Sequence, residues 1–194
     1  MFIKTKNNQD ITYVNTNGAS AEDHFSIAFY NAFRHIYSTS RPIIILCIGT
    51  DRVTGDSLGP MIGYKLKQYT HTIYREVKIY GTLESPVHAI NLEETIHEIH
   101  QNYKDPFIIA IDASLGRMDS IGYLTIGTGS LKPGLGVNKE LPEVGDMFIT
   151  GIVNLNLGTE NVTIHNTRLG LIMKMADVAY SGIVSGLRRV ELIA

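Results

Sequence analysis

The sequence of 194 residues has one cysteine, Cys47, and no tryptophan. A single cysteine cannot form a disulfide within the chain, and it cannot supply a cysteine-rich zinc site. Cys47 stands inside an unbroken apolar run at residues 43–48. We therefore predict a buried structural thiol at this position.

An excess of either charge is also missing, because 17 basic and 19 acidic residues leave a net charge of −2. No global field draws the chain onto nucleic acid or an anionic membrane, and basic residues are not interleaved with aromatic ones. No segment approaches the roughly 20 apolar residues of a membrane span. The first ten residues, MFIKTKNNQD, lack the apolar core of a signal peptide. We expect a cytoplasmic protein without nucleic-acid or membrane partners.

Hydrophobic residues make up 44% of the sequence, which is enough for a substantial core. We find no repeat, linker or low-complexity tract, and the length favours a single domain over residues 1–194. Residues 1–19 read as a loosely ordered N-terminal segment, with a short edge strand at ITYV.

Helical and strand patterns alternate along the rest of the chain, which predicts a three-layer α/β/α sandwich on a mostly parallel sheet. Apolar residues at helical spacing predict an amphipathic helix over residues 21–37. Further helices are expected from Ser57, from Ser85-Pro86, and from Asn166 or Thr167 to about Arg188. Strands are expected at residues 43–48, 77–81, 106–112, 121–126 and 146–155.

Two aspartates follow apolar strands of this predicted sheet. Asp56 lies in RVTGDSLGP just after the first strand, and Asp112 closes the run PFIIAID. In open α/β sheets the site lies outside the carboxyl ends of the strands, so both carboxylates are expected in one crevice. Such a pair can share a proton and activate water, one member as base and the other as acid. It could also hold a hard metal ion, or each aspartate could simply cap a helix or a turn.

Other polar residues could reach the same crevice. Glu84 and His88, in TLESPVHAIN, follow the second strand and are candidates for substrate binding or for support of the acids. A histidine of this kind is more often a surface or capping group. The Gly- and Pro-rich stretch at residues 127–146 reads as a long functional loop. Gly136 would let a substrate backbone approach closely, and Asn138 and Lys139 would offer donors, although Lys139 could equally be solvated.

Several separated motifs then point to a known family. CIGTDRVTGDSLGP, FIIAIDASLG, GTGSLKPGLGVNKELPEVGD and NTRLGLIMKMAD occur in this order. Together they resemble the YyaC family of sporulation proteins from endospore-forming bacteria, over about residues 41–184.

More distantly, the chain is similar to the germination protease, which degrades small acid-soluble spore proteins, and more faintly to the hydrogenase maturation endopeptidases. The two aspartates regarded as catalytic in the germination protease fall on Asp56 and Asp112. These relatives imply a phosphorylase/hydrolase-like α/β/α fold with a mixed five-stranded sheet.

The sequence also departs from these relatives. The hydrogenase endopeptidases use a histidine ligand after the second acid, but no histidine lies between Asp112 and His165. Position 56 is Asp where they usually have Glu. Compared with the germination protease, the chain is much shorter and has no recognisable pro-segment. We therefore expect no metal and no cofactor.

Two hypotheses of function follow. The first is a sporulation-associated peptidase, in the mother cell or forespore, that uses the aspartate pair to hydrolyse peptide bonds in a spore or sporulation protein. The second is a non-catalytic peptide-binding or assembly module that keeps the peptidase fold. A metal-assisted hydrolase is a third option. A homo-oligomer is possible, because the apolar residues of the first helix could serve a core or a dimer interface.

Overall fold

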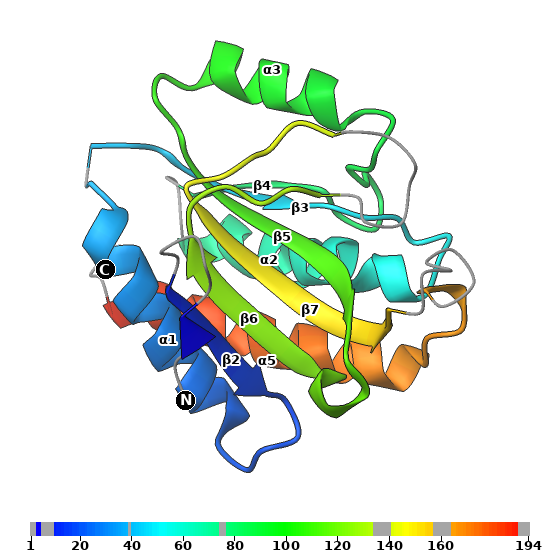
Figure 1. Cartoon of the computed structure of the whole chain (residues 1–194). Coiled ribbons are helices and arrows are strands. Elements are labelled where there is room, and N and C mark those ends of the chain that lie inside the picture. Colours follow the sequence, from blue (N-terminus) through cyan, green and yellow to red (C-terminus); the bar gives the residue numbers. More distant parts are fainter. Residues whose placement is uncertain are drawn as a thin grey trace.

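A mixed sheet forms the centre of the computed structural model (Figure 1), which describes residues 3–4, 10–38, 40–73, 77–133, 141–156 and 164–189. Within these residues the sheet has seven strands, in the spatial order β1 (Ile3–Lys4), β2 (Asp10–Asn15), β6 (Tyr123–Thr128), β7 (Met147–Leu155), β5 (Phe107–Gly116), β3 (Ile43–Cys47) and β4 (Val77–Tyr80). Strands β7, β5, β3 and β4 run parallel. Strand β6 pairs antiparallel with β7, and β2 and β1 continue antiparallel beyond it.

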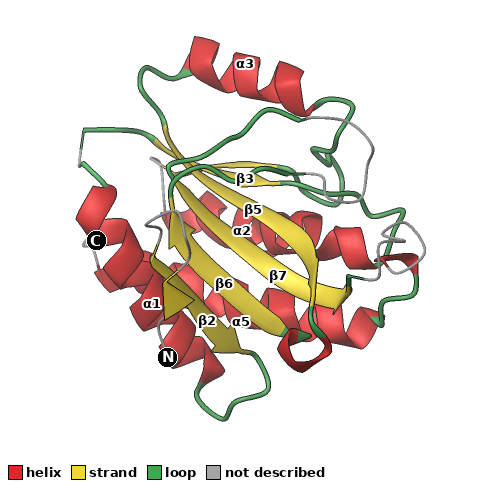
Figure 2. Cartoon of the chain, in the orientation of Figure 1, coloured by secondary structure: helices red, strands yellow, loops and turns green. Residues whose placement is uncertain are grey.

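Helices cover both faces of this sheet, which confirms the predicted α/β/α sandwich. Helices α1 (Ala21–Ile36), α2 (Leu58–Ile73) and α5 (Leu169–Arg189) lie on one face, and α3 (Leu92–Asn102) lies on the other (Figure 2). None of the helices within the described ranges combines the length and the apolar character that crossing a bilayer requires.

Strand β3 contributes side chains to two hydrophobic cores, one on each face of the sheet. Its side chains alternate between the faces of the sheet. Ile43, Ile45 and Cys47 join the core beneath α1, α2 and α5, whereas Ile44 and Leu46 join the core beneath α3. Cys47 is fully buried, and burial raises the pKa of its thiol. The prediction of a buried structural thiol is confirmed.

The aromatic residues of α1 belong to the first core. Phe25, Phe29 and Phe33 are completely buried. The ring of Phe33 stands edge-on to that of Phe107 on β5, with 5.3 Å between the centroids. These residues therefore serve the core of the chain, and a dimer interface is not needed to explain them.

The short strand predicted at ITYV is confirmed, but the number of strands differs from the prediction. Residues 10–15 form β2, which pairs with β6 along its length from Thr12 to Asn15, so this part is an integral strand of the sheet. With β1 it extends the five predicted strands to seven. The added strands are antiparallel, so the parallel character is confined to β7, β5, β3 and β4.

Three element boundaries were also predicted wrongly. Strand β5 does not end at Asp112 but runs on to Gly116 beside β7. Helix α3 begins at Leu92 rather than near Ser85, because residues 82–91 fold into hydrogen-bonded turns. Helix α5 begins at Leu169, where the backbone carbonyl of Arg168 accepts the first helical hydrogen bonds.

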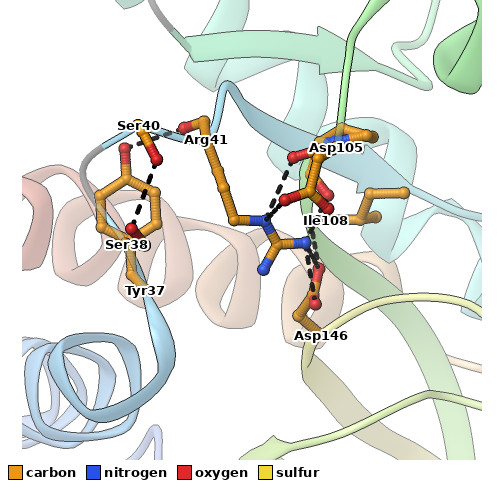
Figure 3. Close-up of polar contacts among 8 residues, drawn as sticks. Tyr37, Ser38, Ser40, Arg41, Asp105, Ile108 and Asp146 are labelled. Carbon is orange, nitrogen blue, oxygen red and sulfur yellow. Dashed lines mark hydrogen bonds and ion pairs between the residues drawn. The ribbon is translucent and has the colours of Figure 1, made fainter.

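An arginine ties together the amino ends of three parallel strands (Figure 3). The Nη2 of Arg41, ahead of β3, donates to both carboxylate oxygens of Asp146, ahead of β7, at 3.1 Å. It also donates to the carbonyl of Pro106 at 2.8 Å. Asp146 in turn accepts the backbone N–H of Ile108 on β5 at 2.9 Å. These contacts join the amino ends of β3, β5 and β7.

Candidate active site

The turn that follows β3 depends on a glycine. Gly49 has a φ of 137°, a conformation that side chains with a Cβ rarely adopt, and a Cβ there would lie 2.0 Å from the carbonyl oxygen of Asp56. The N–H of Thr50 donates to that same carbonyl at 3.1 Å. The chain thus folds back on itself at once, and Asp56 is brought to the end of β3.

Asp56 sits in a 3-10 turn, Gly55–Ser57, that leads directly into α2. This agrees with the prediction of an acid between a strand and a helix. The carboxyl group is partly buried, and this burial is the leading cause that raises its pKa. A hydrogen bond from the backbone of Thr50 and the charge of His88 act in the opposite direction. Asp56 therefore keeps its proton to a higher pH than an exposed aspartate does.

Asp112 occupies a buried position inside β5. Only 6% of its surface is exposed, and its Oδ1 accepts the N–H of Ala113 at 2.8 Å. Ile109 and Ile111 belong to the core beneath α1, α2 and α5, whereas Ile108 and Ala110 belong to the core beneath α3. By the alternation of a strand, the Asp112 side chain projects to the α3 side of the sheet.

Backbone contacts bring the two aspartates to the same end of neighbouring strands. The N–H of Ile48, just past β3, donates to the carbonyl of Ile111 at 2.7 Å, and Asp112 is the next residue on β5. The 3-10 turn that holds Asp56 also packs directly against β5. This arrangement agrees with the expected site at the carboxyl ends of the strands. The functional pairing of the two carboxylates stays a prediction.

Two candidate residues, Glu84 and His88, follow β4, and His88 lies nearer to Asp56. The stretch that carries it is joined to β3, because Val87 pairs with Ile48 and accepts the N–H of Gly49 at 2.7 Å. Glu84 is exposed, and its carboxylate accepts the hydroxyl of Thr82 within its own turn at 2.9 Å. Roles for both residues in binding a substrate stay predictions.

The long loop is described only at its two ends. Gly136, Asn138 and Lys139 lie outside the described residues. The ends form a continuation of the β6–β7 hairpin, in which Leu131 and Val144 exchange backbone hydrogen bonds at 2.8 and 2.9 Å. Leu131, Leu141 and Val144 pack into the core beneath α3, on the side of the sheet to which Asp112 projects.

A polar row beside Asp112 was not found from the sequence. Asp112 on β5 is in register with Thr150 on β7, which is in register with Thr125 on β6. The two threonine hydroxyls are hydrogen bonded at 2.6 Å. The alternation of each strand predicts which residues share a face of the sheet, but it does not predict which strands are neighbours. The row could therefore not be found from the sequence. In the part of the chain that the structure describes, no three His, Cys, Asp or Glu side chains gather closely enough to hold a metal ion.

Comparison with known sequences identifies the family of this chain. The profile of the family described as "Protein of unknown function (DUF1256)" matches residues 13–182. The chain belongs to the DUF1256 family. A relative of this DUF1256 protein is the "Uncharacterized protein YyaC" of Bacillus subtilis (strain 168), which is 48% identical over 171 residues. The aligned region covers 88% of this chain and 81% of the relative, so the resemblance to YyaC is confirmed.

A solved structure supports the fold of this DUF1256 protein. The crystal structure of the [NiFe] hydrogenase maturation protease HycI from Thermococcus kodakarensis KOD1 superposes with a TM-score of 0.54. The match covers 82% of this chain and 97% of HycI, at 16% sequence identity. At this identity the likeness shows a shared α/β fold.

Proposed function

We propose that this DUF1256 protein is a peptidase that hydrolyses peptide bonds in a spore or sporulation protein with Asp56 and Asp112. The observation that carries the proposal is the placement of Asp56 just after β3 and of Asp112 on the adjacent β5 at the level where β3 ends, since Ile48 is hydrogen bonded to Ile111. One of them has a pKa raised by burial. A carboxyl group with a raised pKa is suited to the role of a general acid.

The two acids suit different roles in such a reaction. Asp112, whose Oδ1 accepts the N–H of Ala113, would act as the base. It would take a proton from a water whose oxygen attacks the scissile carbonyl carbon. Asp56, whose pKa is raised by burial, would give its own proton to the leaving nitrogen as the C–N bond breaks. After cleavage, Asp112 releases the proton that it took from the water and Asp56 takes up a new one, so both return to their starting states by exchange with solvent.

The test is cleavage of a panel of spore proteins and synthetic peptides by the pure protein, followed by mass spectrometry. We expect Asp56→Asn and Asp112→Asn each to lower the rate by about 10²- to 10⁴-fold, the usual contribution of a positioned acid or base. Asp51→Asn is the matched control, because Asp51 is an exposed carboxylate in the same turn.

Either of two results would contradict the proposal. One is an Asp56→Asn variant that cleaves as fast as the wild type. The other is stable binding of a spore protein by the wild type without any cleavage, which would favour the non-catalytic binding module.

A further inference from the structure

The polar row beside Asp112 lies on one face of the sheet. Thr150 on β7 is in register with Asp112 on β5 and with Thr125 on β6, and β7 lies between the other two strands (Figure 1). Leu124 and Ile126, on either side of Thr125, belong to the core beneath α1, α2 and α5. Residues in register share a face, so by strand alternation all three polar side chains project to the α3 side.

The two threonine hydroxyls have one proton more than their mutual contact uses. They are hydrogen bonded to each other at 2.6 Å, and in the part of the chain that the structure describes neither hydroxyl makes a second hydrogen bond. Each hydroxyl carries one proton, and the bond between them takes only one of the two. The second proton is therefore available to another acceptor.

Burial determines which hydroxyl keeps this second proton. Only 5% of Thr125 is exposed, whereas Thr150 is partly exposed. A buried hydroxyl proton without an acceptor is costly, so Thr125 donates to Thr150. The proton of Thr150 is then directed away from β6. On its other side lies β5, where Asp112 occupies the position in register.

Apolar side chains flank Thr150 on its own strand. Phe148 and Ile152, the next residues on the same face of β7, are both buried. The ring of Phe148 lies over Gly127 on β6, where an added Cβ would come within 2.4 Å of it, so the ring is turned away from β5. In such apolar surroundings a hydrogen bond is electrostatically stronger than in water.

We propose that the Thr150 hydroxyl and the Asp112 carboxylate together bind one water molecule. Neighbouring strands lie about 4.8 Å apart, and two hydrogen bonds of about 2.8 Å through a water can span this separation. A water accepts the proton of the hydroxyl and also donates to the carboxylate, whereas a carbonyl group can only accept. The bound water thus fits a donor and an acceptor placed side by side.

The part that this water would take in cleavage rests on the proposed function. One of its O–H bonds breaks, and the proton passes to Asp112. The electron pair left on the oxygen forms the new bond to the scissile carbonyl carbon, whose π electrons move to the carbonyl oxygen. Thr150 holds the water through one lone pair and leaves another for this attack.

The test is a set of crystal structures of the full chain that resolve ordered water, for the wild type, Thr150→Val and Thr150→Ser. In the wild type we expect a water about 2.8 Å from both Thr150 Oγ1 and a carboxylate oxygen of Asp112. Valine has nearly the shape of threonine without the hydroxyl, so Thr150→Val should lose this water and Thr150→Ser should keep it. Thr12→Val is the matched control, because Thr12 is partly exposed and, in register with Ile126, lies on the opposite face.

The cleavage assay gives a second readout. Thr150→Val should lower kcat/KM by about 10²-fold, a usual cost of a misplaced reactant. Thr150→Ser should retain most of the activity, because it keeps the hydroxyl, and Thr12→Val should cleave like the wild type.

The structures and the cleavage assay fail independently. A wild type without a water between the two groups, or the same water in Thr150→Val, would overturn this proposal. A water that is lost only in Thr150→Val, in a protein that cleaves nothing, would support it and contradict the proposed function. Cleavage that depends on Asp112, by a wild type without this water, would do the reverse.

Discussion

At the scale of single residues, Asp56 stands out because the fold holds a carboxyl group where its charge is disfavoured. Burial is the leading reason for its raised pKa, and the N–H of Thr50 and the charge of His88 only partly offset it. A site of this kind costs stability in exchange for a group with a useful proton affinity. The cost depends on pH and can be measured.

We predict that Asp56→Asn is more stable than the wild type at neutral pH. An aspartate with a higher pKa in the folded than in the unfolded chain binds more protons when folded, so the free energy of unfolding falls as the pH rises through its titration. The loss begins near the ordinary aspartate pKa of about 3.9 and is complete above the raised value in the folded chain. Asparagine has no such titration.

Urea unfolding of the wild type and of Asp56→Asn at a series of pH values from about 3 to about 8 checks this prediction. The advantage of Asp56→Asn should shrink toward the acid end. Asp51→Asn, which removes an exposed carboxylate of the same turn, serves as the control. An Asp56→Asn variant that is less stable than the wild type at pH 7 would contradict the account of a buried, destabilised acid.

Sequence reasoning located Asp56 because the pattern of strand, turn and helix is local. It could not find the use of Asn91, since an asparagine before a helix reads as a cap, and the structure turns its side chain back toward His88. It could not find the Arg41–Asp146 pair either, because these residues are 105 positions apart. Only the order of the strands brings them together.

At the scale of the elements, α2 approaches the end of β3 closely enough to exclude any side chain at Gly59. A Cβ there would lie 2.2 Å from the carbonyl oxygen of Ile48 and 2.9 Å from its nitrogen. Both atoms are backbone and cannot turn aside. This close contact places the start of α2, and with it the Asp56 turn, against the carboxyl end of the sheet.

We predict that Gly59→Ala lowers the free energy of unfolding by about 1–3 kcal/mol, the usual cost of overpacking. The matched control is Gly170→Ala in the first turn of α5, where no atom lies within 4 Å of the added Cβ. That change should stabilise the protein by about 0.5–1 kcal/mol, because alanine favours a helix. Midpoints of urea unfolding check both, and equal effects of the two substitutions would contradict the role of Gly59.

Element boundaries were the part of the fold that sequence could not predict. The small and polar residues after Asp112 look like a turn, yet β5 continues because β7 offers a partner as far as Leu155. Residues 85–91 have helical character in sequence, but Pro86 and the hydrogen bonds of Thr82 and Asn91 hold them in turns. In both cases a tertiary or local polar contact outweighed the pattern. The patterns of residues 21–37 and 43–48 were reliable because the helix buries one whole face and the strand is buried on both faces.

At the scale of the whole molecule, the two ends of the parallel strands differ in character. At the amino end Arg41 pairs with Asp105 and Asp146, and its guanidinium carbon lies 5.2 Å from the ring centroid of Phe107. Toward the carboxyl end lie Asp56, in the turn after β3, and Asp112, on the neighbouring β5. The sheet of this chain therefore has ion pairs at one end and acidic residues toward the other.

The central claim is that Asp56 and Asp112 act as one unit, and a double-mutant cycle tests it most directly. The measurement is kcat/KM for the most rapidly cleaved peptide in the wild type, Asp56→Asn, Asp112→Asn and the double variant. Residues that serve the same reaction step give strongly non-additive losses. We predict that the double variant is no slower than the slower single variant. Losses that multiply in the double variant, or wild-type cleavage in either single variant, would contradict the account.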